Sequence, residues 1–337
     1  PDCVFGNKGF VLYMTIEILM VIGFCLAAYS IVGNDVPQTL GTFISSNAHR
    51  PWWVLWIYIS SILVVVLLYG WYASGVGDAS YGRLETIPFP EGGITWLYIV
   101  PPILLILLTK YGIPVSTTFL VLTIFSPSSL TSMLTKSMMG YAVAFIVGII
   151  VYRFVVKQIS IHFSKTRDQT PSNIWIGLQW VSTAFLWSQW LIQDLANIFV
   201  YVPRQVPFEF LIFAILVFVV LLGVILYQRG GAIQKIIDTK TGLADIRSAT
   251  IIDFIYALIL LVFKEWSNIP MSTTWVFLGL LAGREFAMSM HLREVNKYRT
   301  SRNVSKDAMK LMLGLALSVF LAVTLPWFYN FVTSLAS

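Results

Sequence analysis

Two acidic residues, each beside a carboxamide, stand at the ends of long apolar segments. The two motifs are Asn34-Asp35-Val36-Pro37-Gln38 and Gln193-Asp194-Leu195-Ala196-Asn197. An ionised Asp without a partner at the centre of a membrane helix costs about 2.5–3.5 kcal/mol. A bound hard cation such as Na⁺ would offset that cost, because carboxylate and carboxamide oxygens suit such ions. Uptake of a proton by each Asp would have the same effect. The alternative is that both residues are helix caps at the headgroup level.

A second pattern is a proline followed two residues later by Ser-Thr-Thr, at 113–118 and again at 269–274. Proline suits the first position of a helix, because the first N–H groups have no partner within the helix. Those N–H groups, the helix dipole and the neighbouring hydroxyls suit an anion. The candidate anion ligands are Ser116, Thr117, Thr118, Ser272, Thr273 and Thr274. The alternative is a proline-initiated helix whose hydroxyls bond its own backbone.

Both patterns recur in the same order, which indicates two related halves. The acidic motif is repeated after 159 residues and the Ser-Thr-Thr motif after 156, and Asp precedes Ser by 81 residues in one half and 78 in the other. Equivalent loops differ in charge, since 74–93 holds one Lys or Arg and 228–248 holds four. Basic loops are typically cytoplasmic, so equivalent loops face opposite sides. We therefore predict inverted-topology repeats with a site at their interface near the membrane midplane.

The composition identifies the broad class of protein. Of the 337 residues, 57% are hydrophobic and 11% are charged, whereas a soluble domain carries about 25% charged residues. There are too few ionised side chains to cover a soluble globule, which excludes a soluble enzyme, a disordered protein and a disulfide scaffold. The sequence also contains no nucleophile–base pair, no His/Cys metal motif and no nucleotide-binding loop. We therefore expect neither an enzyme nor a bound cofactor.

Ten apolar segments approach the length of about 20 residues that crosses a bilayer. They are 10–33, 53–73, 94–109, 114–127, 138–156, 173–200, 207–227, 249–264, 270–290 and 308–333. The predicted fold is an all-α polytopic membrane protein with two inverted repeats of about five spans and broken or re-entrant helices at the midplane. The first repeat is 1–156, a basic cytoplasmic connector is 157–172, and the second repeat is 173–337.

Positive charge predicts the orientation. With both termini outside, 16 of the 22 Lys and Arg residues lie on the inner side and five on the outer side, as the positive-inside bias requires. Arg284 remains within a span. One interpretation is that it acts as a gate or attracts the anion, and the other is that it pairs locally or extends its charged end to the inner membrane surface. The predicted location is a plasma or inner membrane, and the basic tracts contact lipid and not nucleic acid.

At these residues the sequence resembles the inorganic phosphate transporter (PiT) family of cation-coupled symporters. That family carries a Gly-Ala-Asn-Asp-Val-Ala-Asn-Ala-type motif and a Pro-Val-Ser-Thr-Thr-His motif in each half. The corresponding segments here are 33–42, 193–197, 114–118 and 270–274. The resemblance implies symport of inorganic phosphate with Na⁺ or H⁺ by alternating access.

The resemblance also implies roles for individual residues. Substrate contacts would come from Ser116, Thr117, Thr118, Ser272, Thr273, Thr274, Asn34 and Gln193, and the coupling cation would bind Asp35, Asp194, Gln38 and Asn197. Phe119 and Trp275 replace the family's His, which leaves sulfate or another oxyanion open as the substrate. A non-transporting subunit of a larger assembly is the alternative from another class, and a homodimer is also open.

Overall fold

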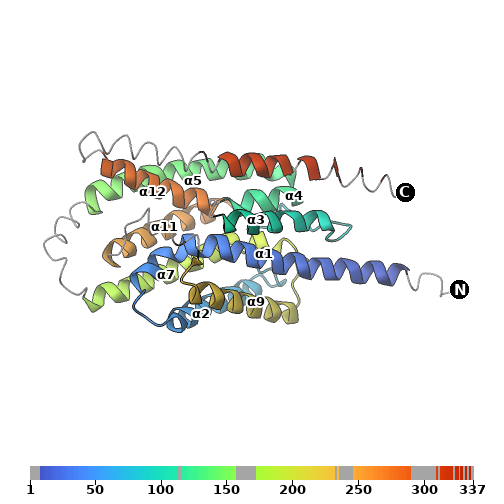
Figure 1. Ribbon diagram of the computed structural model, residues 1–337, viewed down its shortest axis with the longest axis horizontal. Helices are drawn as coiled ribbons and strands as arrows, with labels where there is room; N and C mark the ends of the chain where they lie inside the picture. The colour runs from blue at the N-terminus through green and yellow to red at the C-terminus, as the bar shows by residue number, and fades with distance from the viewer. Residues whose placement is uncertain are drawn as a thin grey trace.

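The computed structural model describes residues 8–111, 115–156, 172–231, 234 and 246–289, and parts of the segment between 309 and 334. Over these residues the chain is helical and contains no strand. Figure 1 shows long helices that run along one common axis. The start of α1 and the last described residues lie at the same end of the bundle (Figure 1).

Between residues 8 and 289 the structure describes fourteen helical elements. They are α1 Lys8–Ser46, α2 Trp52–Ala73, η1 Trp96–Ile99, α3 Val100–Lys110, η2 Thr118–Leu122, α4 Thr123–Phe125, η3 Pro127–Ser129, α5 Leu130–Val151, η4 Tyr152–Val156, α7 Asn173–Asp194, α8 Ala196–Phe199, α9 Phe208–Tyr227, α11 Ile246–Trp266 and α12 Thr273–Ser289.

Five of the described helices are long and apolar enough to cross a bilayer. They lie at Glu17–Ser46, Trp52–Ala73, Pro127–Val155, Phe208–Tyr227 and Ile246–Trp266. Shorter apolar helices lie at Trp96–Lys110 and Met312–Leu325. The chain is therefore an all-helical, multi-pass membrane protein, as its composition predicts.

Several predicted spans have different bounds in the structure. The first helix continues to Ser46 instead of ending at 33, and α5 begins at Leu130 instead of 138. The predicted span 173–200 is divided into α7 and α8 at Leu195, whose backbone stays in the right-handed helical region and whose N–H still donates to the Leu191 carbonyl oxygen at 3.0 Å. The short segment 114–127 becomes a π-helical turn, η2, followed by α4. Residues 157–171 of the predicted connector lie outside the described residues.

Helix α1 continues through Pro37, and polar side chains next to the proline bond the helix backbone. A proline inside a helix removes one backbone hydrogen bond and clashes with the preceding turn. Here the Gln38 Nε2 donates to the Asn34 carbonyl oxygen at 2.9 Å, and the Thr39 hydroxyl donates to the Asp35 carbonyl oxygen at 3.0 Å. These bonds add side-chain donors to the backbone carbonyls of the turn before the proline.

The closest packing of two helices is that of α5 against α12, and it depends on glycine. A Cβ atom at Gly279 would lie 2.5 Å from the Tyr141 carbonyl oxygen, and one at Gly148 would lie 2.6 Å from the Leu280 carbonyl oxygen. Small residues at such crossings let two membrane helices approach closely. Similar pairings join α1 with α3 and α7 with α11, while α2 packs against α9.

Candidate functional site

The first acidic motif lies inside α1 and contacts the first Ser-Thr-Thr turn. Asp35 is only 1% exposed. Its Oδ1 accepts a hydrogen bond from Asn34 Nδ2 at 2.6 Å, and its Oδ2 accepts one from the Thr117 hydroxyl at 2.9 Å. Asn34 Nδ2 also donates to the Val115 carbonyl oxygen at 3.0 Å. Asp35 is therefore a buried residue within a helix and not a helix cap.

The second acidic motif lies where α7 is followed by α8, and it contacts both Ser-Thr-Thr turns. Asp194 is fully buried at the end of α7, and its Oδ1 accepts a hydrogen bond from Asn197 Nδ2 at 2.8 Å. The Thr273 side chain lies beside the same carboxylate. Asn197 Nδ2 is also 3.2 Å from the Thr117 hydroxyl and 3.3 Å from the Thr118 hydroxyl. Asn197 therefore joins the acidic motif of one half to the hydroxyls of the other.

The serines of the two turns make equivalent bonds. The Ser116 hydroxyl accepts from the Phe119 N–H at 3.3 Å, and the Ser272 hydroxyl accepts from the Trp275 N–H at 3.3 Å. Each serine thus satisfies one first-turn amide, as helix-capping side chains do. This part of the alternative interpretation is correct for the two serines, whereas the threonines of the first turn point to the acidic motifs.

The two turns also contact each other directly. The Thr118 hydroxyl donates to the Met271 carbonyl oxygen at 3.2 Å. Phe119 packs edge-to-face on Trp275, with ring centroids 5.4 Å apart. Phe119 and Trp275 occupy the positions where the phosphate transporter family has His. In this chain these two positions therefore form an aromatic contact between the turns.

Several buried oxygen atoms of the acidic motifs accept no hydrogen bond from the described residues. They are Gln38 Oε1, Gln193 Oε1, Asp194 Oδ2 and Asn197 Oδ1. Buried polar atoms are normally paired, so such atoms call for a bound water, ion or other partner. All four are acceptors, which is the chemistry of a hard-cation ligand. In the same described residues, no group of three His, Cys, Asp or Glu side chains gathers to hold another kind of metal ion.

The structure thus brings most of the predicted site residues together. Hydrogen bonds connect Asn34, Asp35, Thr117, Thr118, Asp194 and Asn197. Gln193 directly precedes Asp194 in the sequence, and its Nε2 donates to the Leu260 carbonyl oxygen at 2.9 Å. Thr274 is buried at the start of α12.

Sequence reasoning missed a third buried carboxylate. Asp253 on α11 is 1% exposed, and it accepts hydrogen bonds from the Thr42 hydroxyl at 2.5 Å and the Thr183 hydroxyl at 3.0 Å. Its position within an apolar span was a usable signal, because intramembrane acidic residues are functional candidates by default. Tyr256, one turn later, donates its hydroxyl to the Thr273 carbonyl oxygen at 3.0 Å and lies near both Asp35 and Asp194.

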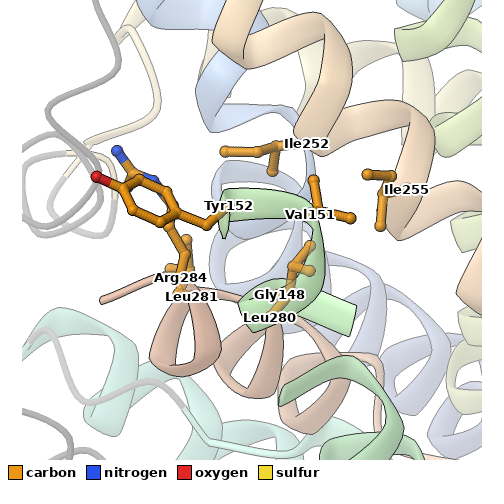
Figure 2. Close-up of a pocket in the computed structure, with 8 residues that line it drawn as sticks. All are labelled: Gly148, Val151, Tyr152, Ile252, Ile255, Leu280, Leu281 and Arg284. Atoms are coloured by element: carbon orange, nitrogen blue, oxygen red, sulfur yellow. The ribbon is translucent and has the colours of Figure 1, made fainter. Parts of the chain in front are cut away.

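Arg284 lies away from the Ser-Thr-Thr turn. Figure 2 shows it beside Tyr152 of η4, in a pocket that Gly148 and Leu280 also line. The ionisable groups within electrostatic range of it are Tyr152 and Glu285. This position favours local interactions over direct contact with an anion at the turn.

Comparison with known proteins identifies the fold. No model of a known protein family matches the chain, and no curated protein matches it in sequence. Among solved structures, the chain is similar to a sodium-dependent phosphate transporter, with a TM-score of 0.58 and 15% sequence identity over 94% of this chain and 99% of that one. The chain therefore has the fold of that transporter, as the predicted all-α polytopic membrane protein requires.

Proposed function

We propose that the chain is a secondary transporter that carries inorganic phosphate together with Na⁺ by alternating access. The observation that carries this proposal is the contact of Asn197 with Asp194 on one side and with Thr117 and Thr118 on the other. It joins acidic groups and the hydroxyls of a helix start in one buried cluster. The similarity to the structure of a sodium-dependent phosphate transporter supports the same substrate and cation.

The anion would bind at the two Ser-Thr-Thr turns. A tetrahedral oxyanion accepts hydrogen bonds, and the turns offer hydroxyls beside the first amides of η2 and α12. The two turns touch through Thr118 and Met271, so one anion would contact both. The helix dipoles would add partial positive charge at this point.

The cation would bind at the acidic motifs. Asp35 and Asp194 lie close enough for their charges to act on one another. The unpaired oxygens of Gln38, Gln193, Asp194 and Asn197 belong to the same two motifs. Two buried carboxylates repel each other, and a bound cation or proton relieves that repulsion. The cation would also offset the charge of the oxyanion, which gives a physical reason for coupled transport. H⁺ is the alternative coupling ion.

Inverted repeats are part of the same proposal. The pairing of α1 with α3 has a counterpart in the pairing of α7 with α11, and the contact of α1 with α9 has one in that of α7 with α2. The equivalent bonds of Ser116 and Ser272 support the same symmetry. Such repeats allow one bundle to rock against the other around a fixed site.

Alternating access requires an opening that reaches the site from one side at a time. A cavity of about 270 Å³ lies between α1, α3 and α9, where Gly33, Thr109 and Lys110 line it. The Thr109 hydroxyl is 3.4 Å from Asn34 Oδ1, so the cavity wall contacts the site's carboxamide. Lys110 belongs to the side predicted to face the cytoplasm. This supports a conformation in which the site is more accessible from the cytoplasm than from outside.

Uptake into proteoliposomes tests the proposal. The purified chain should accumulate labelled phosphate when Na⁺ is higher outside, and accumulation should fall to the background of empty vesicles when K⁺ replaces Na⁺. A proton gradient without Na⁺ separates the two coupling ions, and unlabelled sulfate tests the identity of the anion. If neither phosphate nor sulfate accumulates under either gradient, the transport proposal is wrong.

A pair of threonine variants links the assay to the site. Thr117→Val removes a hydroxyl that bonds Asp35 and Asn197, whereas Thr135→Val removes an exposed hydroxyl that bonds only the Thr131 carbonyl oxygen. We expect Thr117→Val to lower uptake about tenfold or more, as loss of a hydrogen bond to a charged group does. Thr135→Val should transport as the unaltered chain does.

A further inference from the structure

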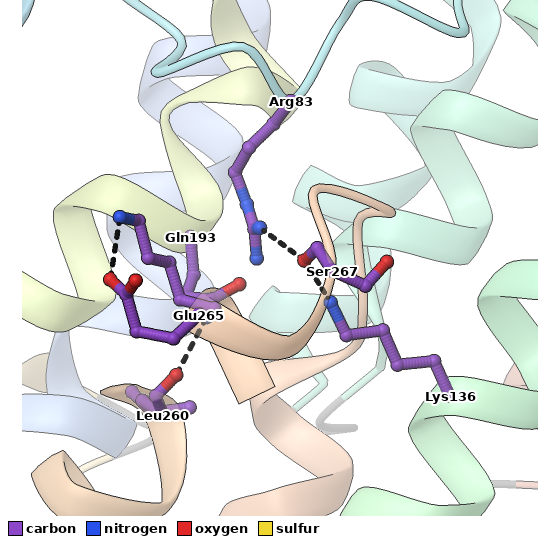
Figure 3. A network of polar contacts seen from close by, with 7 residues as sticks. Arg83, Lys136, Gln193, Leu260, Glu265 and Ser267 are labelled. Atoms are coloured by element: carbon purple, nitrogen blue, oxygen red, sulfur yellow. Dashed lines mark hydrogen bonds and ion pairs between the residues drawn. The ribbon is translucent and has the colours of Figure 1, made fainter. Parts of the chain in front are cut away.

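Two buried cationic side chains converge on the turn that precedes the second Ser-Thr-Thr motif. Arg83 lies in the loop between α2 and α3 and is 1% exposed, and Lys136 lies on α5 and is 4% exposed. Both donate to the Ser267 carbonyl oxygen, at 3.5 Å from Arg83 Nη1 and 2.6 Å from Lys136 Nζ. Lys136 Nζ also donates to the Ile269 carbonyl oxygen at 2.8 Å. Figure 3 shows the two side chains reaching this turn from different elements.

Neither cation forms an ion pair with an acidic side chain among the described residues. Moreover, Nε and Nη2 of Arg83 are buried and have no hydrogen-bond partner there. A buried charge without compensating bonds is strongly unfavourable. The carbonyl oxygens at the turn satisfy Lys136 well and Arg83 poorly, so the long bond from Nη1 does not explain why this guanidinium is buried.

The unpaired atoms of Arg83 have a specific geometry. Nε and Nη2 are the two nitrogens on one edge of the guanidinium, and they present parallel N–H groups that match two oxygens of a phosphate or carboxylate. Lys136 has three N–H donors and uses two on carbonyl oxygens, which leaves one. Arg83 would therefore offer two parallel N–H groups, and Lys136 one further N–H group, to the same anion.

The charge of Arg83 persists at neutral pH. Burial lowers the pKa of Arg83 to about 10, and the nearby charge of Asp194 opposes that decrease. Because a pKa near 10 lies well above pH 7, the guanidinium stays protonated and can attract an anion.

The cationic pair lies next to the proposed substrate site. Ser137 follows Lys136 on α5, and its hydroxyl accepts a hydrogen bond from the Ser272 N–H at 2.9 Å. Asp194, which acts on Arg83, belongs to the proposed cation site. Arg83 and Lys136 also belong to the few basic residues on the side predicted to face outward. They therefore stand between that side and the second Ser-Thr-Thr turn.

We infer that Arg83 and Lys136 form a binding subsite for a tetrahedral oxyanion beside the second Ser-Thr-Thr turn, with the Nε–Nη2 edge of Arg83 as its bidentate donor. This inference rests on the proposed function and names residues that neither the motif resemblance nor the sequence analysis assigned. The guanidinium of Arg83 supplies full positive charge, which hydroxyls and helix dipoles alone do not. An oxyanion arriving from the predicted outer side would meet it before it reaches the turn.

Binding of labelled inorganic phosphate to the purified full-length chain in Na⁺ tests the subsite. Arg83→Lys keeps the charge and removes the fork, so we expect the half-saturating phosphate concentration to rise about tenfold or more. Lys136→Met should weaken binding as well, and Lys136→Arg should restore part of it. Labelled Na⁺ binding without phosphate should change less than twofold in Arg83→Lys.

Arg204 offers a matched control. It is a second largely buried arginine in a loop, but its Nε and Nη2 both donate to the Ile87 carbonyl oxygen, at 3.1 and 2.7 Å, and its Nη1 donates to the Val202 carbonyl oxygen at 2.8 Å. Because its fork is already occupied, Arg204→Lys should leave the half-saturating phosphate concentration unchanged. Size-exclusion profiles and apparent melting temperatures show whether each variant remains folded.

The outcomes separate this inference from the proposed function. If the unaltered chain binds and transports phosphate and Arg83→Lys does so equally well, the subsite is refuted and transport stands. If Arg83→Lys changes Na⁺ binding and not phosphate binding, Arg83 is an internal counter-ion of Asp194 and the subsite is again refuted. If phosphate binds through Arg83 but is never accumulated, the subsite stands and transport falls. If the unaltered chain binds no phosphate, both fall.

Discussion

At the scale of single residues, the site depends on carboxylates whose bonding is incomplete. Asp194 uses one oxygen to accept from Asn197, and its other oxygen has no partner among the described residues. Asp35 has a partner on each oxygen but lies within range of the charge of Asp194. Asp253, by contrast, is held by a threonine on each side. The incomplete bonding at Asp194 is what a bound cation would complete.

Neutralising either acidic residue tests that role. Asp35→Asn and Asp194→Asn keep the side-chain shape and remove the charge, so we expect Na⁺-driven phosphate uptake to fall at least tenfold, since a charged ligand is lost. Labelled uptake at several Na⁺ concentrations measures the effect. Glu265→Gln, at an exposed residue that pairs with Lys264, is the control and should retain uptake. Unchanged uptake in both Asp variants would remove the cation role.

At the scale of elements, short helices and closely packed helices position the residues of the site. The backbone stays helical through Leu195, so Asn197 lies one turn after Asp194 on the same face and its amide reaches both Asp194 and the first turn. The π-helical turn η2 follows Thr117 directly, and such turns occur frequently at functional sites. The position of the second turn is fixed by the helix that follows it, because α12 packs closely against α5 at glycine residues. The packing of α5 and α12 therefore controls where the second Ser-Thr-Thr turn lies.

Alanine at Gly279 tests that packing. Its Cβ would lie 2.5 Å from the Tyr141 carbonyl oxygen, which is backbone and cannot move aside alone. We expect a destabilisation of ~1–3 kcal/mol, as overpacking causes, measured as a lower apparent melting temperature in detergent. Gly177→Ala on α7 is the matched control, since a Cβ there meets nothing within 4 Å. Alanine favours a helix over glycine, so Gly177→Ala should leave stability equal or raise it. Equal melting temperatures for both variants would contradict the predicted crowding.

At the scale of the whole molecule, the proposal depends on two halves of opposite orientation. The described ends of the chain lie at the same end of the bundle (Figure 1), as an even number of spans requires. Asn197 and the Phe119–Trp275 contact join the two halves at the site. A rocking motion of the halves would therefore act directly on the contacts that hold the ions.

Labelling of single cysteines tests the orientation of equivalent loops. Glu91 and Gln228 are exposed and stand in the loops that follow α2 and α9. In a cysteine-free background, an impermeant thiol reagent should label Glu91→Cys in intact cells and Gln228→Cys only after the membrane is opened. Labelling of both from one side would exclude inverted repeats, and the reverse pattern would exclude outside termini. The unsubstituted cysteine-free chain, which should remain unlabelled, is the control.

Much of this architecture follows from the sequence, because hydropathy and repeated motifs are local properties. The apolar runs predict the helices, and the recurrence of Pro-x-Ser-Thr-Thr predicts two turns of equal chemistry. Hydropathy placed the end of the first span at 33, whereas the helix runs on to Ser46. The reason is that Gln38 and Thr39 are polar, so a hydropathy criterion ends the span before them. In the structure both side chains bond the backbone of the helix.

Only the tertiary structure decided which polar residues share one site. Asn197 meets Thr117 across 80 residues of chain, and Arg83 meets Ser267 across 184. Such contacts depend on how helices pack, and composition or spacing within one segment does not encode them. The burial of Lys136 was hidden for the same reason, since it stands in a segment expected to be a loop and lies instead on a packed helix. The sequence determined the chemical groups that are available, whereas helix packing determined which of them can act on one ion.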